Sequence, residues 1–152
     1  MGTQTRRRLA VVMDPVQSID YKKDTTLAML WAAQDAGFEL YYMELQHLLL
    51  RGGTACGLLH PLQVFRDPRC WFALQAPEEQ PLACMDVILM RKDPPFDMDY
   101  IYATYLLEQA EAAGALVANH PASLRDCNEK LFAASFPQCS APLLVSSQAS
   151  PL

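Results

Sequence analysis

Short apolar runs alternate with stretches of helical periodicity along the chain. One run covers residues 9–13 (LAVVM), and a similar one covers residues 87–90 (VILM). Runs of this length are typical of strands that are buried on both faces of a parallel sheet. Weaker runs at residues 38–43 and 116–118 predict two further strands. The pattern therefore predicts an α/β fold with an open, mainly parallel sheet and flanking helices.

Two helices are predicted in the connections of this sheet. The first covers residues 26–36, with Asp24 or Thr25 as its N-cap and Gly37 beyond its end. A helix between two such strands predicts a parallel crossover. The second follows Pro94 and Pro95, which end the strand because proline cannot donate a ladder hydrogen bond. Its expected buried stripe is Tyr102, Leu106, Ala110 and Ala113, and its expected polar face is Thr104, Glu108 and Glu111.

The other segments are less regular. Residues 46–84 form an excursion in which Gly52 and Gly53 mark a turn, residues 54–65 predict a hairpin arm and residues 75–81 predict a loop. Ser123 and Asp126 have the spacing of a capping signal, and a third helix is predicted over residues 124–135. Its expected buried face is Leu124, Cys127, Leu131 and Ala134. We expect one α/β domain over residues 1–136, followed at 137–152 by a linker or the truncated start of another region.

Arg91 is the main candidate for a binding residue. It follows the strand at residues 87–90, and ligands of open α/β sheets bind outside the carboxyl ends of strands. Its planar guanidinium suits a carboxylate or a phosphate. The alternative is a structural ion pair with Asp14 or Asp93, and the residue pattern leaves both open. The polar loop at residues 16–23 also follows a strand, so we expect it to lie near Arg91.

The remaining charged groups have simpler explanations. Asp93, Asp97 and Asp99 could bind a metal ion, but capping of the following helix is favoured, because acids stabilise a helix N-terminus. Lys130 could hold a phosphate or pair with Asp126 one helical turn away, and the spacing favours the pair. No catalytic residue and no metal ligand is assigned.

Composition narrows the class of protein. The chain has 152 residues, of which 51% are hydrophobic and 19% charged, as in a single globular domain. Its formal net charge of -5 argues against a nucleic-acid partner. No window is long and apolar enough to span a membrane. The five cysteines have no C-x-x-C spacing, which favours reduced, buried thiols in a cytosolic protein over a disulfide framework.

Five stretches of the chain carry a resemblance to a known family. They are VVMDP at residues 11–15, KKDTTLAML at 22–30, ELYYME at 39–44, DVILMRKDPPFDMDYIYATYLLE at 86–108 and SLRDCNEKLF at 123–132. In this order they resemble the bacterial glutathione synthetases of the ATP-grasp ligase superfamily. The resemblance implies that residues 1–136 form a Rossmann-like (pre-ATP-grasp) substrate-binding domain and that residues 137–152 begin the ATP-grasp region.

The resemblance also implies an activity. The family joins γ-glutamylcysteine to glycine with ATP and Mg²⁺, through an acyl phosphate, in the cytoplasm. We expect the chain alone to be inactive, because the family's Mg²⁺ ligands and most of its phosphate-binding groups would follow Leu152. The alternative is a non-catalytic module of the same fold that binds the dipeptide or forms homo-oligomers. A phosphoacceptor receiver domain using Asp14 is disfavoured, because RLAVVMDP at residues 8–15 lacks paired acids.

Four site residues follow from the resemblance. Arg91 matches the arginine of the MRKDPPFD motif and is implicated in holding γ-glutamylcysteine, which favours a substrate role over a structural ion pair. Ser18 and Asp20 belong to the loop that lines the dipeptide site. Lys130 matches the lysine of the RDCNEK motif and is implicated in ATP binding.

Overall fold

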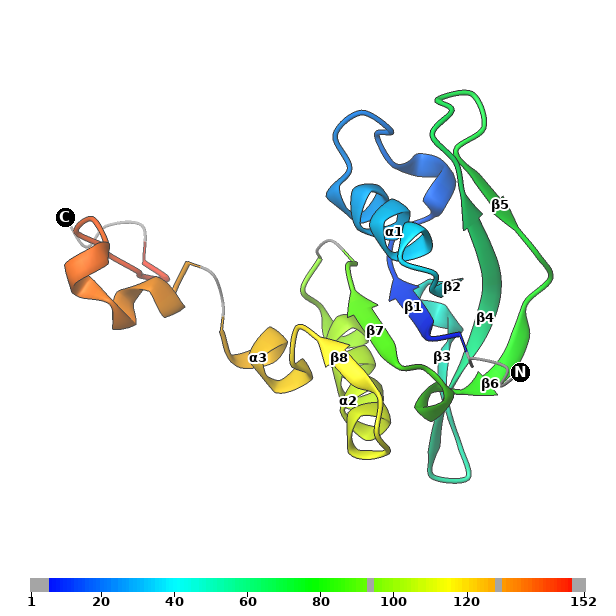
Figure 1. Ribbon diagram of the computed structural model, residues 1–152. Coiled ribbons are helices and arrows are strands. Elements are labelled where there is room, and N and C mark those ends of the chain that lie inside the picture. The colour runs from blue at the N-terminus through cyan, green and yellow to red at the C-terminus, as the bar shows by residue number, and fades with distance from the viewer. Residues whose placement is uncertain (1–5, 93–94, 128–129, 149–152) are drawn as a thin grey trace.

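The computed structural model describes residues 6–92, 95–127 and 130–148. They form an eight-stranded sheet with the order β3-β4-β2-β1-β7-β8, in which β5 and β6 both pair with β4 (Figure 1). The predicted α/β class with an open, mostly parallel sheet is confirmed. Within the described residues, no helix has the length and apolar character that crossing a membrane requires.

The parallel half of the sheet consists of β1 (Arg8–Val12), β2 (Glu39–Met43), β7 (Val87–Met90) and β8 (Leu116–Ala118). Strand β1 pairs in parallel with both β2 and β7, and β7 pairs in parallel with β8. Three of the four strands lie within the residues predicted for them, and β1 begins one residue before the predicted range, at Arg8. Their carboxyl ends therefore meet at one edge of the sheet, where the Arg91 amide extends the ladder by donating to Val12 O at 2.8 Å.

The antiparallel excursion is organised on β4 (Thr54–Val64), which pairs with β2, β3 (Leu48–Arg51), β5 (Phe72–Leu74) and β6 (Glu78–Pro81). Gly52 and Gly53 form the β3–β4 turn with positive φ angles of 56° and 82°, which glycine adopts without steric cost. The predicted hairpin arm is confirmed. The predicted loop at residues 75–81 is wrong for its last four residues, because the β4 backbone pairs with this polar segment.

Two helices cover opposite faces of the sheet. Helix α1 (Thr25–Asp35) packs with Leu9 and Val11 of β1, and α2 (Met98–Ala112) packs with Ala10 and Val12 of the same strand. Successive residues of a strand point to opposite faces. The sheet is therefore buried on both faces, as the apolar run in β1 predicts.

The predicted buried stripe of α2 is confirmed at Ala110 and partly at Leu106, which packs against the core, and is wrong at Tyr102 and Ala113. Its buried residues are Ala103, Thr104, Leu107 and Ala110, whereas Tyr102 is 61% exposed. Thr104 was expected on the polar face. Its hydroxyl group tolerates burial because it donates to Ile101 O at 2.6 Å and accepts from Arg125 Nη1 at 3.0 Å. The buried face of α2 is therefore rotated relative to the expected one, and it includes one polar residue whose hydroxyl group is hydrogen-bonded.

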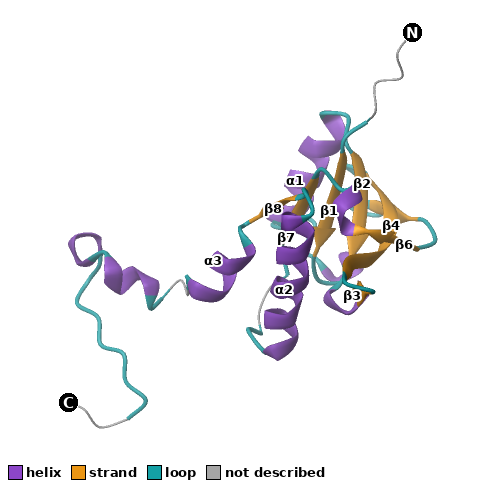
Figure 2. Cartoon of the chain, turned by 90° about the horizontal axis from the view of Figure 1, so that it is seen from below, coloured by secondary structure: helices purple, strands orange, loops and turns teal. Residues whose placement is uncertain are grey.

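The third helix is shorter and starts earlier than predicted. Helix α3 covers Pro121–Asp126, with His120 rather than Ser123 as its N-cap. Pro121 fits the first helical turn, where no amide donor is needed. The predicted helix at 124–135 is wrong, since α3 ends at Asp126 and residues Phe132–Ser135 form a separate 3-10 helix. Both views show the chain after α3 leading away from the sheet (Figures 1 and 2).

Candidate functional site

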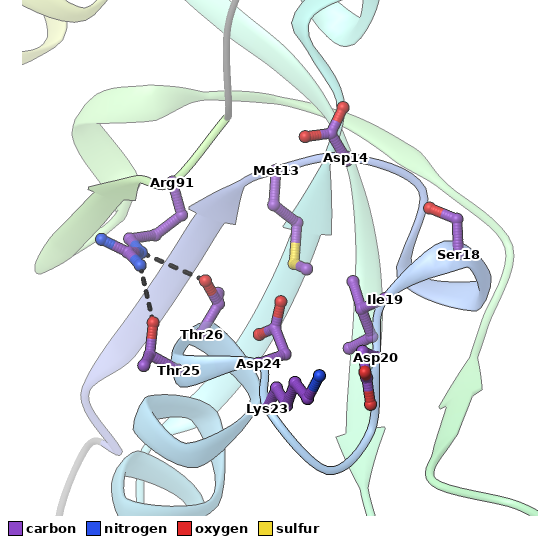
Figure 3. A pocket seen from close by; sticks show the side chains of 10 residues that line it. All are labelled: Met13, Asp14, Ser18, Ile19, Asp20, Lys23, Asp24, Thr25, Thr26 and Arg91. Atoms are coloured by element: carbon purple, nitrogen blue, oxygen red, sulfur yellow. Dashed lines mark hydrogen bonds between the residues drawn. The ribbon is translucent and has the colours of Figure 1, made fainter.

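A cavity of about 470 Å³ opens where β1 and β7 end and α1 begins. Figure 3 shows the side chains that line it. They come from the end of β1, the loop at residues 14–24, the first turn of α1 and the residue after β7. The lining residues are Met13, Asp14, Ser18, Ile19, Asp20, Lys23, Asp24, Thr25, Thr26 and Arg91. The structure thus brings Arg91, Ser18 and Asp20 into one cavity at the predicted edge of the sheet.

The Arg91 side chain is held by two hydroxyl groups. Its Nε donates to Thr26 Oγ1 at 3.1 Å, and its Nη2 donates to Thr25 Oγ1 at 3.0 Å. Both acceptors are neutral, and a guanidinium has five N–H donors. In the described part of the chain, no carboxylate forms a salt bridge with Arg91. The side chain is therefore oriented by α1 while its positive charge remains available to an anion.

Asp14, one expected ion-pair partner of Arg91, contacts a different cation. Its Oδ1 lies 2.9 Å from Lys92 Nζ, so the predicted structural pair with Arg91 is wrong for Asp14. Asp93, the other expected partner, lies outside the described residues. Lys92 is also close enough to Tyr100 in α2 to oppose the rise in the Tyr100 pKa that burial causes. Arg91 and Lys92, the two residues after β7, therefore lie near helices on opposite faces of the sheet: Arg91 contacts α1, and Lys92 lies near α2.

The first turn of α1 forms one wall of the cavity. Asp24 is the N-cap, and its Oδ1 accepts from the Leu27 amide at 2.7 Å. The exposed first-turn amides of a helix favour a negative charge nearby. Thr26 is buried while Thr25 is exposed, so the two hydroxyl groups reach Arg91 from different depths. The wall and Arg91 both favour an anionic ligand group.

The loop between β1 and α1 is shaped by local hydrogen bonds. Ser18 lies at the end of the 3-10 helix Val16–Ser18, and its Oγ donates to Pro15 O at 2.7 Å. Asp20 Oδ1 accepts from the Lys22 amide at 3.0 Å. The cavity therefore contains the cations Lys23 and Arg91 together with carboxylates. Such a mixture is suited to a ligand that carries both charges.

Seven lining residues were not predicted as site residues: Met13, Asp14, Ile19, Lys23, Asp24, Thr25 and Thr26. Two of them, Asp24 and Thr25, were considered only as helix caps. A signal was available, because a helix that starts directly after a polar loop at the carboxyl edge presents its first turn to the same space as that loop. The hydrogen bonds from Arg91 to the two hydroxyl groups join residues that are 65 and 66 positions apart in the sequence. No local sequence pattern predicts them.

Lys130 is not among the residues that line this cavity. It lies beyond α3, in an exposed turn before the 3-10 helix Phe132–Ser135. Helix α3 precedes it in the chain. Arg125 of α3 bonds to α2 from Nη2 to Glu108 Oε2 at 2.9 Å, and its guanidinium lies 4.4 Å from the Tyr105 ring. The role of Lys130 in ATP binding stays a prediction.

The acids before α2 act as predicted where the structure describes them. Asp97 is the N-cap and accepts from the Tyr100 amide at 3.0 Å, and Asp99 lies in the first turn. The described residues contain no group of three or more His, Cys, Asp or Glu side chains placed to hold a metal ion. The five cysteines are free thiols, but only Cys56 is buried, so the expectation of buried thiols is wrong for the other four.

The chain matches one family and several proteins of known name. Residues 8–125 match the family model of the prokaryotic glutathione synthetase, N-terminal domain. The glutathione synthetase of Pseudomonas putida is 61% identical over 139 residues, which cover 91% of this chain and 44% of that protein. The glutathione synthetase of Pseudomonas syringae is 61% identical over 142 residues, which cover 93% of this chain and 44% of that protein. The glutathione synthetase of Yersinia pestis is 55% identical over 139 residues, which cover 91% of this chain and 44% of that protein. The chain thus spans less than half the length of these relatives.

Proposed function

The chain belongs to the prokaryotic glutathione synthetase family, and from that premise we propose that its cavity at Arg91 binds γ-glutamylcysteine. Glutathione synthetases are ATP-dependent ligases. In the whole enzyme the bound dipeptide is joined to glycine, and glutathione is the product. The domain described here supplies the dipeptide-binding surface of that reaction.

The observation that carries this proposal is the hydrogen bonding of the Arg91 side chain and its place in the cavity. The guanidinium is fixed by two neutral hydroxyl groups and shares a cavity with Ser18 and Asp20. A carboxylate can accept two parallel hydrogen bonds from such a group. Arg91 is therefore suited to bind one carboxylate of the dipeptide, since its fork is already oriented before the ligand arrives.

The rest of the cavity suits the other groups of the dipeptide. γ-Glutamylcysteine carries two carboxylates and one ammonium group, so it needs neighbours of both signs. Lys23 offers a second cation, and Asp20 offers a carboxylate for the ammonium group. The volume of about 470 Å³ lies within the range of roughly 300–1,000 Å³ that is typical of small-molecule sites.

ATP and Mg²⁺ belong to the whole enzyme in this proposal. Lys130 is the residue of this chain that we propose contacts ATP. We assign no Mg²⁺ ligand to this chain, because the family resemblance places the Mg²⁺ ligands in the ATP-grasp region. A cytoplasmic location and a homo-oligomeric assembly are also proposed, as the family resemblance implies.

Calorimetric titration of γ-glutamylcysteine into the purified chain tests the proposal. Arg91→Lys removes the planar guanidinium that can donate two parallel hydrogen bonds. It should weaken binding by roughly ten- to hundredfold, which is the affinity lost with about one charge-assisted hydrogen bond. Arg91→Ala should be at least as damaging. Arg51→Lys is the matched control, because Arg51 is an exposed arginine in β3 that pairs with Glu79 and does not line the cavity.

Two results would contradict the proposal. If the wild-type chain produces no binding heat with γ-glutamylcysteine, the cavity is not a dipeptide site. If Arg91→Lys lowers the melting temperature sharply while its dipeptide affinity stays near wild type, Arg91 is a structural residue.

The alternative function is a non-catalytic module that binds the dipeptide without ligating it. Both functions share the binding step and differ in glutathione formation. We expect none from the purified chain with γ-glutamylcysteine, glycine, ATP and Mg²⁺, since the matched family model describes only the amino-terminal domain. Glutathione formed by a preparation free of host enzyme would show that the chain is catalytic by itself.

A further inference from the structure

The loop that carries Ser18 and Asp20 is anchored from outside the cavity by Trp71. The indole Nε1 of Trp71 donates to Val16 O at 3.2 Å, across 55 positions of sequence. The Trp71 ring also lies 6.2 Å from the ring of Tyr21, which belongs to the same loop. Trp71 does not line the cavity. Any effect of Trp71 on a ligand must therefore act through the loop.

Local bonds alone do not fix where the loop lies. The bonds of Ser18 to Pro15, and of Lys22 and Lys23 to Asp20, join residues within the loop itself. They set its shape, but they do not set its distance from Arg91 on β7. The bond from Trp71 and the complete burial of the Val16 side chain do connect the loop to the rest of the fold.

The segment that presents Trp71 is connected to α1 by hydrogen bonds at the end of β4. Gln34 of α1 bonds both backbone groups of Val64 at the end of β4, at 2.8 and 3.0 Å. The adjacent Trp31 donates from Nε1 to Phe65 O at 3.1 Å, and the Phe65 amide donates to Trp71 O at 2.8 Å. Helix α1, whose first turn holds Arg91, thus also fixes the connection between β4 and β5 that presents Trp71.

We propose that Trp71 is a positioning residue that holds residues 16–21 in place, so that Ser18 and Asp20 line the same cavity as Arg91. The inference goes beyond the proposed function, and it relies on that function only for the identity of the ligand. It gives the antiparallel excursion a role in binding, because Trp71 lies between β4 and β5. An indole bond already formed before binding reduces the loop ordering that a ligand would otherwise have to induce.

Two phenylalanine variants of the full chain test the inference. Trp71→Phe keeps an aromatic ring and removes the bond to the loop backbone. Trp31→Phe is the matched control: it also loses an indole bond and also contacts Tyr21, but its bond is to Phe65. Amide hydrogen exchange of residues 16–23, measured without ligand, should increase more in Trp71→Phe than in Trp31→Phe, because Trp31 makes no hydrogen bond to the loop and reaches it only through the Tyr21 ring and through Phe65. The affinity for γ-glutamylcysteine should fall roughly two- to tenfold in Trp71→Phe and by less in Trp31→Phe.

The outcomes separate the inference from the proposed function. Unchanged exchange in Trp71→Phe, or an equal increase in both variants, overturns the role of Trp71 in holding the loop. Faster exchange with unchanged dipeptide affinity overturns its role in binding. If the wild-type chain does not bind γ-glutamylcysteine, the proposed function is wrong, and the exchange measurement alone then decides whether Trp71 positions the loop.

Discussion

The parallel half of the sheet and the antiparallel excursion differ in what holds their strands in place. In the parallel half, β1 and β7 are buried in all but their first residue. In the excursion, β6 has the sequence EEQP and no buried residue, and it exists as a strand because it pairs with β4. Apolar burial therefore fixes β1 and β7, whereas backbone pairing fixes β6. The proposed ligand site uses both regions, with Arg91 from the parallel half and Trp71 from the excursion.

The largest difference is expected between two leucines. Leu89 of β7 is 8% exposed and Leu50 of β3 is 55% exposed. Leu89→Ala should lower the free energy of unfolding by about 2–5 kcal/mol, because it leaves a cavity in the core. Leu50→Ala should change it by about 0.5 kcal/mol or less. Urea unfolding of both variants measures the difference, and similar losses would show that the excursion is packed as tightly as the parallel half.

Gly57 of β4 tests the boundary between the two regions. A Cβ atom at this position would lie 3.0 Å from Leu82 Cδ2 and 3.1 Å from Met43 Sδ, and both neighbours are fully buried. Gly57→Ala should therefore cost about 1–3 kcal/mol through overpacking. Urea unfolding checks the value. A variant as stable as wild type would mean that the two neighbouring side chains turn aside without losing contacts.

The N-cap of α2 provides an intermediate effect within the parallel half. Asp97→Ala removes the acceptor of the Tyr100 amide and should cost about 0.5–2 kcal/mol. Asp97→Asn keeps an acceptor oxygen and should lose much less, so it is the control. Thermal unfolding of both variants measures the cap. Equal losses would assign the effect to the charge of Asp97 rather than to its hydrogen bond.

His47, at the junction of the two regions, predicts a small pH dependence. Burial lowers its pKa below 6.5, with His60 acting in the same direction and Glu44 opposing both. The unfolded chain then binds a proton more readily than the folded chain, so stability falls as the pH drops below about 6.5. Its Nδ1 accepts from the Glu44 amide at 3.1 Å. His47→Asn retains a possible acceptor and should lose less stability than wild type between about pH 7.5 and 5.5.

The exposed pair of Arg51 and Glu79, which joins β3 to β6 in the excursion, should have the smallest effect. The hydrogen bond from Arg51 lowers the pKa of Glu79, so any stabilisation is present above the usual carboxyl pKa of 4.5 and is lost as the pH falls through the folded-state value. Exposed ion pairs contribute little. Arg51→Ala should leave the melting temperature at pH 7 nearly unchanged, whereas a clear drop would show that side chains as well as backbone pairing hold β6.

The sequence by itself determined the elements whose cause is local. Residues 9–13 and 87–90 can only bury their apolar side chains in a covered strand, and Asp24 and Asp97 cap helices through bonds to residues three positions away. The position of Arg91 at the carboxyl edge followed from those strands. The resemblance to glutathione synthetases rested on stretches that include most of these two strands and both helix caps, and the match over residues 8–125 confirms it.

Only the tertiary structure decided the features whose cause is distant in the sequence. Thr104 is buried because Arg125 donates to it from α3, and residues 78–81 are a strand because β4 supplies the partner groups. Thr25 and Thr26 orient Arg91, and Trp71 reaches Val16, through contacts between segments that no local pattern connects. A polar or aromatic side chain can find a hydrogen-bond or packing partner in many places, and only the packed chain determines which partner it has.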